Sequence, residues 1–361
     1  MEIIVNAIVL KNKKLEYQSR KIYSCGKERS KCMTNKNFEK GIAFCLLATM
    51  SWGGMFPVMT SALQHIDTYT FTCMRYAIAG ALFYLVLCRQ EPNRIPLDTA
   101  SLLKAWFFGT CGFAGYQFLV FEGQRLAGAE GALTASIMMA TMPLQAFLFN
   151  WIVRRKTPKL FVLFFILLSF SGVLLVITRG DFASLVKHPQ DFGPQILIIL
   201  GALCWVIYTA GASYLPDLSP VRYTTITTAL GLGSAVVITA GLLGSSVVPV
   251  PSGIEVIHTI PHLIYMSLVA GFIGVLAWNI GNKILTPLNG TLFMDVVPIT
   301  AFTVSAITGK VPHPVQIGGA AITIFSLICN NYFIRRETLR KASTKNLPDN
   351  ISTTTNMSKV N

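Results

Sequence analysis

The chain has 361 residues, of which 52% are apolar and only 13% are charged, and its mean hydropathy is +0.55. Soluble domains carry about 25% charged residues, so this chain cannot bury its apolar surface and still present a solvated face. The composition excludes a soluble globular domain, an intrinsically disordered chain and a small disulfide scaffold. It predicts a protein embedded in a lipid bilayer.

The net charge of +14 is concentrated at the two ends of the chain. Residues 1–40 contain 10 Lys/Arg and 4 Asp/Glu, and residues 334–361 contain 6 and 2. Basic tails beside hydrophobic segments are typical of cytoplasmic flanks rather than of nucleic-acid-binding arms, so no nucleic-acid partner is expected. Met33 opens the stretch that leads into the first apolar segment. Residues 1–32 are therefore a candidate for a mis-assigned extension or a dispensable tail, with Met33 as the start.

Between the tails, the chain contains ten apolar stretches, each close to the ~20 residues that a helix needs to cross the hydrocarbon core. Because the bilayer offers no hydrogen-bond partner to an open backbone, each stretch is expected to be helical. The predicted fold is an all-α integral membrane protein. Its ten transmembrane helices are expected at Gly41–Leu63, Thr70–Cys88, Leu103–Phe121, Ala132–Val153, Leu160–Thr178, Ile196–Leu215, Tyr223–Leu243, Ile264–Ile284, Gly290–Ile307 and Val315–Phe333.

The distribution of lysine and arginine predicts the orientation of these helices. With the N-terminus in the cytoplasm, the inside segments hold 25 Lys/Arg and the outside loops hold 4. Cytoplasmic loops carry such an excess of basic residues in multi-pass proteins. We therefore expect both termini inside, in a protein of the cell's inner (cytoplasmic) membrane.

The sequence also contains an internal duplication. Trp52 in the first span matches Trp205 in the sixth, and Pro143 in the fourth matches Pro298 in the ninth at an offset of 155 residues. The expected repeats are 41–178 and 194–333. Since each contains five spans, an odd number, the second repeat is expected to lie upside-down relative to the first. Inverted repeats are typical of transporters, with the substrate site between them near the midplane.

Five short motifs, in this order and spacing, resemble the EamA type of the drug/metabolite transporter superfamily. The resemblance implies a secondary carrier, typically an exporter, for amino acids, nucleotide-related compounds, sugars or drugs. It covers about 41–333, but the Gly-Glu that the family often has after spans four and nine is absent. The motifs are Ala48-Thr49-Met50-Ser51-Trp52-Gly53-Gly54, Met74-Arg75-Tyr76, Met142-Pro143-Leu144, Ala277-Trp278-Asn279 followed by Lys283, and Val297-Pro298-Ile299.

Ionisable side chains inside a membrane are costly and therefore point to function. Asp295 lies about 8 Å deep in the ninth span, at 1.5 Å per residue. It is predicted to couple transport to a proton or cation, or to bind a substrate amine; the alternative is a structural carboxylate. The long side chain of Arg75 could snorkel to the headgroups; alternatively, the family resemblance implies a packed arginine that holds the repeats together or meets an anionic substrate. Glu122 is a candidate gate residue, or an interfacial partner of Arg125.

A second set of candidates is aromatic and polar. Trp52 and Trp278 lie too deep for the aromatic belt of the membrane interface, and Asn279, Tyr116 and Gln117 add polar groups at comparable depth. The set predicts an aromatic-lined substrate pocket, although ordinary helix packing accounts for any one member. The two matched prolines, Pro143 and Pro298, are candidate hinges; the alternative is a pair of kinks that neighbouring helices stabilise.

The motifs of nucleotide hydrolysis, zinc hydrolysis and serine catalysis are all missing from the sequence. No catalytic residue, cofactor or metal is therefore predicted. The expected function is secondary-active transport of a small organic metabolite (amino-acid, nucleotide-related or drug-like), by export or exchange, with a proton or counter-substrate as a possible partner. An intramembrane enzyme and a channel are the alternatives. The carrier is expected to be a monomer or a homodimer.

Overall fold

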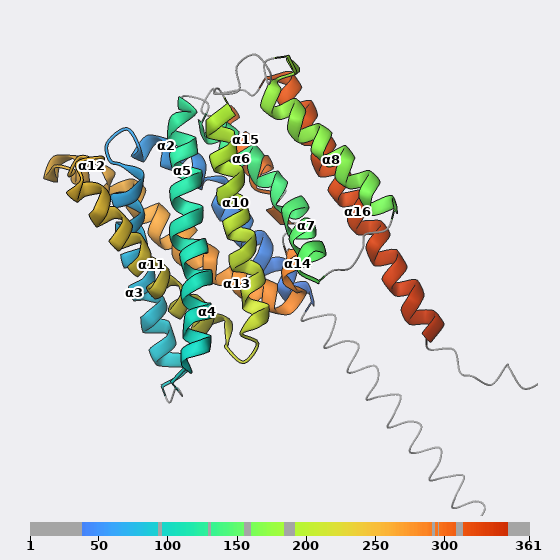
Figure 1. Ribbon diagram of the computed structural model, residues 1–361, viewed down its shortest axis with the longest axis horizontal. Coiled ribbons are helices and arrows are strands. Elements are labelled where there is room, and N and C mark those ends of the chain that lie inside the picture. Colours follow the sequence, from blue (N-terminus) through green and yellow to red (C-terminus); the bar gives the residue numbers. More distant parts are fainter. Residues whose placement is uncertain are drawn as a thin grey trace, which may run out of the picture.

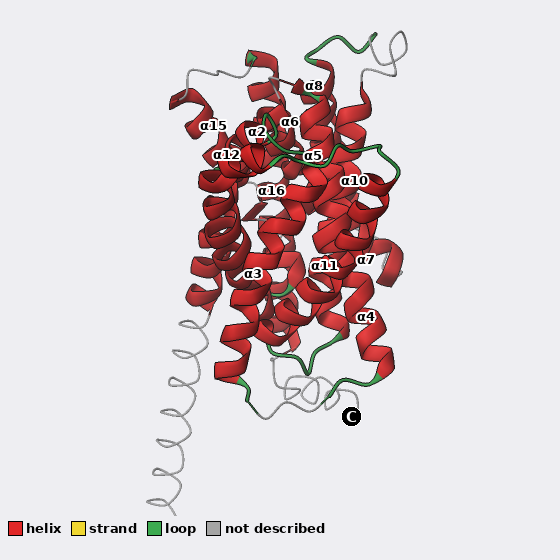
Figure 2. Cartoon of the chain, turned by 90° about the vertical axis from the view of Figure 1, so that its left-hand side faces the viewer, coloured by secondary structure: helices red, strands yellow, loops and turns green. Residues whose placement is uncertain are grey.

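The structure is a computed structural model, and it describes residues 38–92, 96–128, 131–154, 160–183, 192–290, 293–294, 296–307 and 313–345. These residues form helices and connecting turns, without a strand among them (Figure 2). The first helix runs over Phe38–Ala62 and is interrupted by a turn at Gly54, after which it is α2 (Met55–Ala62). The others are α3 (Thr68–Gln90), α4 (Thr99–Thr110), α5 (Tyr116–Leu126), α6 (Gly131–Met138), α7 (Met142–Arg154), α8 (Leu160–Thr178), α10 (Gly193–Gly211), α11 (Pro220–Gly244), α12 (Gly253–Ile264), α13 (Val275–Leu285), α14 (Pro287–Gly290), α15 (Val296–Ile307) and α16 (Pro314–Lys345).

Several helices begin at a polar side chain that accepts a hydrogen bond from the first turn. Asp67 caps α3, Asp98 caps α4 and Ser219 caps α11, while Ser252 and Glu255 form a reciprocal capping box at α12. These side chains satisfy backbone N–H groups that have no partner within the helix. They explain why the helices begin where the apolar stretches do.

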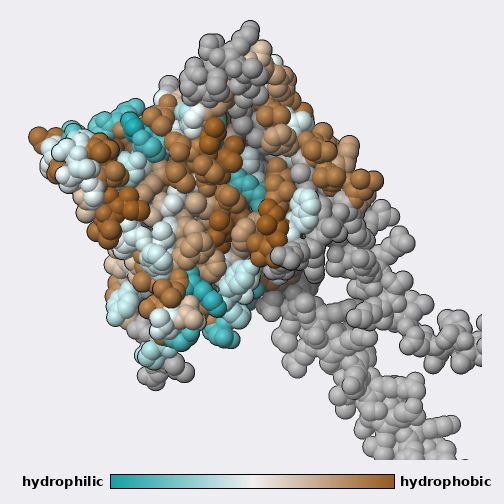
Figure 3. All heavy atoms as spheres, in the orientation of Figure 1, coloured by the Kyte–Doolittle hydropathy of each residue, from teal (hydrophilic) through white to brown (hydrophobic). Residues whose placement is uncertain are grey.

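The described part of the chain is a multi-pass membrane protein. Six of its helices are long and apolar enough to cross a bilayer, judged by length and composition, and Leu163–Val176 and Pro314–Ser326 are shorter apolar helices. Apolar side chains cover much of the flank of the bundle, whereas hydrophilic ones gather mainly toward its two ends (Figure 3). The six spans are Phe38–Ala62, Thr68–Gln90, Thr134–Val153, Gly193–Tyr214, Pro220–Gly244 and Gly253–Leu285.

The helices form a bundle, and α8 and α16 run side by side along one flank of it (Figure 1). Two glycines allow this close approach. A Cβ atom added to Gly172 would lie 2.6 Å from the carbonyl oxygen of Gly319, and a Cβ added to Gly319 would lie 2.6 Å from that of Gly172. In lipid, small residues let helix backbones approach closely enough for strong packing.

Helices α4 and α11 cross at a second glycine contact. A Cβ on Gly109 would lie 2.2 Å from the carbonyl oxygen of Thr227, and one on Gly231 would lie 2.2 Å from the carbonyl oxygen of Gly109. Real Cβ contacts are never this short, so both positions require glycine. By contrast, a Cβ on Gly233 of the same helix would meet nothing within 4 Å.

Two of the long helices contain π-helical turns. Segment η1 (Cys111–Gly115) joins α4 to α5, and η6 (Tyr265–Gly274) joins α12 to α13. They lie in the third and the eighth predicted spans, which are the third span of each half of the chain. Because a π-turn leaves carbonyl groups without their usual partner, such turns are often found at functional sites.

The matched prolines lie at the starts of helices rather than in their middles. A 3₁₀ turn, η3 (Met139–Thr141), precedes Pro143, which is the second residue of α7. Pro298 is the third residue of α15, and a 3₁₀ turn occupies 293–294. A proline in the first turn lacks an N–H that would have no partner there anyway. A 3₁₀ turn thus precedes each matched proline in the chain, and the hinges expected at these prolines stay a prediction.

Candidate substrate site

Three tryptophans from distant parts of the sequence meet inside the bundle. Trp52, Trp205 and Trp278 come from the first helix, α10 and α13, and all three side chains are buried. The ring centroids of Trp52 and Trp205 lie 5.3 Å apart with the rings perpendicular, and those of Trp52 and Trp278 lie 5.2 Å apart. These are favourable aromatic geometries. The two tryptophans matched by the internal duplication are thus in direct contact.

Hydrogen bonds fix two of these indoles. The Nε1 of Trp52 donates to the carbonyl oxygen of Ala270, 2.9 Å away in the π-helical segment η6, and the Nε1 of Trp278 donates to Thr209 Oγ1 at 3.0 Å. The Nε1 of Trp205 is buried and has no hydrogen-bond partner. One indole donor in the cluster is therefore left without an acceptor.

Asn279 lies next to this tryptophan cluster and links α13 to two other helices. Its Nδ2 donates to the hydroxyl of Tyr208 at 2.6 Å and to Thr224 Oγ1 at 2.8 Å. The hydroxyl of Tyr223 donates to the carbonyl oxygen of Tyr208 at 2.7 Å. Tyr208 also contacts Trp205, with 4.9 Å between ring centroids. Asn279 is therefore held at the edge of the aromatic cluster.

The polar partners of Asn279 were not among the residues predicted from the sequence. Tyr208 lies three residues after Trp205, on the same face of α10, and this spacing was the available signal. Thr224 is one of several threonines in α11, so the sequence did not distinguish it from the others as a partner of Asn279. Which threonine meets Asn279 depends on how α11 and α13 pack, which one sequence does not specify.

Arg75 is buried in a second cluster, formed by α3, α5 and the first helix, and its side chain is only 1% exposed. Its Nη1 donates to Gln117 Oε1 at 3.2 Å, and Gln117 Nε2 donates to the hydroxyl of Tyr76 at 2.8 Å. Both terminal nitrogens lie 3.9 Å from the Met55 Sδ. The guanidinium also lies 4.7 Å from the centroid of the Tyr76 ring and 5.8 Å from that of Phe121. Arg75 therefore does not snorkel to the headgroups.

Tyr116 connects the two clusters. It precedes Gln117 in the chain, and its ring centroid lies 5.1 Å from that of Trp205. Its hydroxyl is 3.6 Å from the Met139 Sδ, next to the break before α7. The structure thus brings together five of the residues predicted to line a pocket or to carry charge within it, namely Trp52, Tyr116, Gln117, Trp278 and Asn279, with Arg75 beside them.

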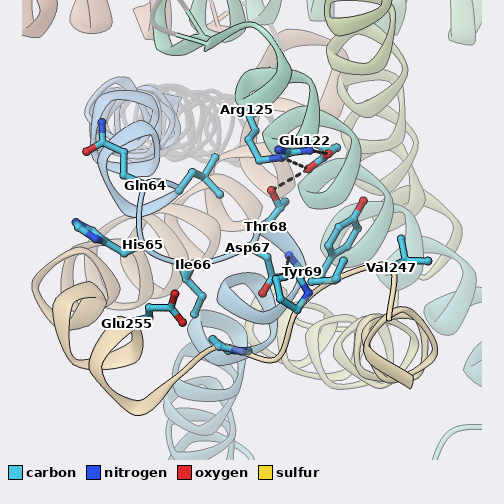
Figure 4. Close-up of a pocket in the computed structure, with 14 residues that line it drawn as sticks. Gln64, His65, Ile66, Asp67, Thr68, Tyr69, Glu122, Arg125, Val247 and Glu255 are labelled. Carbon is cyan, nitrogen blue, oxygen red and sulfur yellow. Dashed lines mark hydrogen bonds and ion pairs between the residues drawn. The ribbon is translucent and has the colours of Figure 1, made fainter. Parts of the chain in front are cut away.

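Glu122 lies elsewhere, at one end of the bundle, in a pocket of about 420 Å³ (Figure 4). It forms an ion pair with Arg125, whose Nε donates to Glu122 Oε2 at 3.0 Å, and Thr68 Oγ1 donates to the same oxygen at 3.3 Å. His65 lies on another wall of this pocket, with its ring centroid 5.5 Å from that of His258. The sequence offered two roles for Glu122, a gate residue or an interfacial partner of Arg125. The observed ion pair corresponds to the second.

Comparison with known proteins decides the family. The model of the EamA-like transporter family matches the chain twice, over residues 39–178 and 194–332. The chain belongs to the EamA-like transporter family. Among Bacillus subtilis (strain 168) proteins, this EamA-type chain is 35% identical to the uncharacterized transporter YrdR over 306 residues, covering 84% of the chain and 95% of YrdR. It is 27% identical to the uncharacterized transporter YyaM over 290 residues, covering 78% and 92%.

A solved crystal structure shares the fold of this EamA-type protein. The two align with a TM-score of 0.59 and 17% sequence identity, covering 82% of this chain and 99% of the other. The family and the names of its relatives support a membrane transporter. The clusters around Trp52 and Arg75 are therefore candidates for the substrate path of an EamA-type transporter.

Two of the residues singled out in the EamA-type sequence, Asp295 and Met33, lie outside the residues that the structure describes. Asp295 lies outside the described residues, between the 3₁₀ turn at 293–294 and α15. Met33 and the tail that contains it are also outside them. Their predicted roles rest on the sequence.

Proposed function

We propose that this protein is a secondary-active transporter of a small organic metabolite, in the amino-acid, nucleotide-related or drug-like range. It works by alternating access between two inverted five-helix repeats and exports or exchanges its substrate across the cytoplasmic membrane. The observation that carries the proposal is the contact between Trp52 and Trp205, at 5.3 Å between ring centroids. Through it, the aromatic and polar candidates of both halves of the chain surround one buried region.

The burial of this region supports alternating access. Trp278, Gln117 and Asn279 are all buried, although two of them carry polar groups that water would otherwise solvate. A carrier must close its site to both sides at one stage of its cycle, whereas a channel needs a continuous polar path. Counterflow separates the two, because only a carrier exchanges labelled for unlabelled substrate one for one.

The π-helical segments support a site that changes shape. Segment η6 receives the hydrogen bond from Trp52 through its Ala270 carbonyl, and the hydroxyl of Tyr265, its first residue, donates to the carbonyl oxygen of Ser51 at 2.7 Å. These two bonds join the first helix to the eighth predicted span. Because π-turns contain an extra residue, they can shift by local rewinding with little change elsewhere.

The orientation is part of the proposal. A green fluorescent protein fused after residue 361 is expected to fluoresce, and an alkaline phosphatase fused there is expected to be inactive, because both report a cytoplasmic C-terminus. After residue 180, in a loop expected outside, a fused green fluorescent protein should not fluoresce and a fused alkaline phosphatase should be active. An active C-terminal phosphatase would overturn the proposed orientation.

Asp295 is proposed to couple transport to a proton or cation, or to bind a substrate amine. We expect Asp295→Asn to reduce transport much more than it reduces the amount of folded protein in the membrane, because the amide keeps the shape and loses the charge. Flux in proteoliposomes and fluorescence-detected size exclusion measure the two quantities. Equal losses of flux and folded yield would make Asp295 a structural residue.

Transport itself is tested in proteoliposomes loaded with a cytoplasmic metabolite extract. The expected result is time-dependent loss of a small group of chemically related metabolites, accelerated by a pH gradient or by an external counter-substrate. Empty liposomes provide the control for leakage. Retention of every metabolite by protein that is folded and correctly inserted would contradict the proposed transport activity.

A further inference from the structure

Arg75 is a buried cation that no carboxylate of the described residues neutralises. No carboxylate among the described residues forms an ion pair with it, and its Nε has no hydrogen-bond partner. Arginine carries five N–H donors and remains charged in proteins. Gln117 Oε1 accepts one of these donors, and the sulfur of Met55, at 3.9 Å, is a weak acceptor for two others. Only one of the donors of Arg75 therefore meets an oxygen acceptor, and its Nε meets none.

The rings beside Arg75 do not offset this cost. Removing an ion from water has a large cost in free energy, even after the protein relaxes. A cation–π contact offsets only part of that cost, and only the Tyr76 ring, at 4.7 Å, is close. The contacts of Arg75 with the described residues therefore leave part of the desolvation cost of its guanidinium uncompensated. A bound anion would restore the balance.

Other unpaired groups near Arg75 can also donate hydrogen bonds. Thr72 lies one turn earlier on the same face of α3, and its buried Oγ1 has no partner. The buried Nε1 of Trp205 likewise has none, and the ring of Trp205 contacts Tyr116, the residue before Gln117. Arg75 Nε, Thr72 Oγ1 and Trp205 Nε1 are thus three buried donors without a partner, two on α3 and one on α10. Such an arrangement suits acceptor oxygens.

The charge of this cluster selects the kind of anion. Arg75 is the one lysine or arginine that is buried among the described residues whose exposure is defined. Arg125 is paired with Glu122, and Lys283 Nζ donates to the carbonyl oxygens of Pro216 and Leu218. A single positive charge matches a carboxylate, whereas a phosphate dianion would remain half-neutralised. The neighbouring rings of Trp52, Trp205 and Tyr116 offer apolar surface to the rest of the ligand.

We propose that Arg75 binds the carboxylate of the transported substrate, and that the substrate class is organic monoacids with an aromatic or apolar body. Gln117 positions the guanidinium, and the thioether of Met55 gives way to the carboxylate oxygens. This inference rests on the proposed function and deepens it.

The first experiment uses the purified full-length chain in detergent and three probes that share a phenyl ring and differ in charge. Phenylacetate carries one negative charge, phenylacetamide carries none, and phenylphosphonate carries two at alkaline pH. Binding is followed by quenching of the tryptophan fluorescence and by thermal shift. Phenylacetate is expected to bind at least about tenfold more tightly than either of the others, the range for a lost charge-assisted hydrogen bond. Equal affinity for acid and amide, or no binding of phenylacetate, overturns the inference.

Variants then test whether Arg75 is responsible. Arg75→Gln should weaken phenylacetate binding at least about tenfold and remove the preference over phenylacetamide. Arg125→Gln, which removes an arginine that is paired and half-exposed, is the matched control and should leave the affinity unchanged. Undiminished binding by Arg75→Gln would mean that the carboxylate site lies elsewhere.

A variant that retains Arg75 tests whether the loss of binding in Arg75→Gln reflects a lost ligand contact or a loss of protein stability. Gln117→Glu places a carboxylate where the Gln117 oxygen already lies 3.2 Å from Arg75. It should raise the melting temperature by supplying the missing anion, and it should weaken phenylacetate binding at least about tenfold by competing for the guanidinium. A more stable protein with unchanged phenylacetate affinity would make Arg75 structural and overturn the inference.

Flux measurements separate this inference from the proposed function. If acids bind through Arg75 but no metabolite crosses the membrane of the proteoliposomes, the carboxylate site is supported and the proposed transport activity is contradicted. If neutral and cationic metabolites cross as readily as acids, and Arg75→Gln transports them equally well, the transport activity is supported and the carboxylate site is contradicted.

Discussion

Gly231→Ala should destabilise the folded protein by about 1–3 kcal/mol, the usual cost of overpacking a close contact. The added Cβ would lie 2.2 Å from the carbonyl oxygen of Gly109, and this atom belongs to the backbone and cannot rotate away. Helices α4 and α11 would have to separate, losing dispersion contacts that drive helix association in lipid. The expected readout is a melting temperature several degrees lower and a smaller monodisperse peak in size exclusion.

Gly233→Ala is the matched control for this substitution. It changes the same residue type on the same helix, but its Cβ would meet nothing within 4 Å. Alanine has the higher helix propensity, so this variant should be as stable as the parent or slightly more so. Similar losses in both variants would show that the α4–α11 crossing does not depend on Gly231.

Trp278→Ala should have the largest effect of any single truncation at the candidate substrate site. The side chain is fully buried at 0% exposed, contacts the ring of Trp52 and donates to Thr209. Truncating a buried tryptophan costs about 3–5 kcal/mol through lost contacts and the remaining cavity. We expect low folded yield and no measurable transport from the protein that does fold. Trp278→Phe should recover much of the yield, because it retains an aromatic ring.

Trp106→Ala provides the comparison for Trp278→Ala. Trp106 is 49% exposed on the surface of α4, where its Nε1 donates to Ser234 Oγ at 3.0 Å. Its loss removes one hydrogen bond and leaves no cavity, so yield and transport should remain close to those of the parent. If the two alanine variants behave alike, the central cluster contributes no more than a peripheral contact does.

The sequence was most informative about the helices and about which residues lie deep within them. Periodicity is not needed for this, because about 20 consecutive apolar residues predict a spanning helix directly. Trp52 and Trp278 were placed too deep for an interfacial belt, and the structure buries both. The irregular turns were not predictable, since η6 has no sequence signal that distinguishes it from an α-helix.

The sequence was least informative about lateral partners. It left Arg75 with three roles, and only the packing of α3 against α5 excludes contact with the headgroups. Likewise, nothing in the spacing of Asn279 indicates that Tyr208 and Thr224 will meet it. Such contacts depend on the rotation of each helix about its axis, which is set by neighbours far away in the chain.

The pairing of α8 with α16 has a consequence for biogenesis. The ribosome completes α8 more than a hundred residues before it reaches α16, yet the face of α8 that contains Gly172 packs against Gly319 of α16. Until the last helix is inserted, that face has only lipid or the translocation machinery to cover it. Chains truncated before residue 314 leave this face of α8 uncovered. They should therefore be degraded by membrane proteases faster than chains that contain α16.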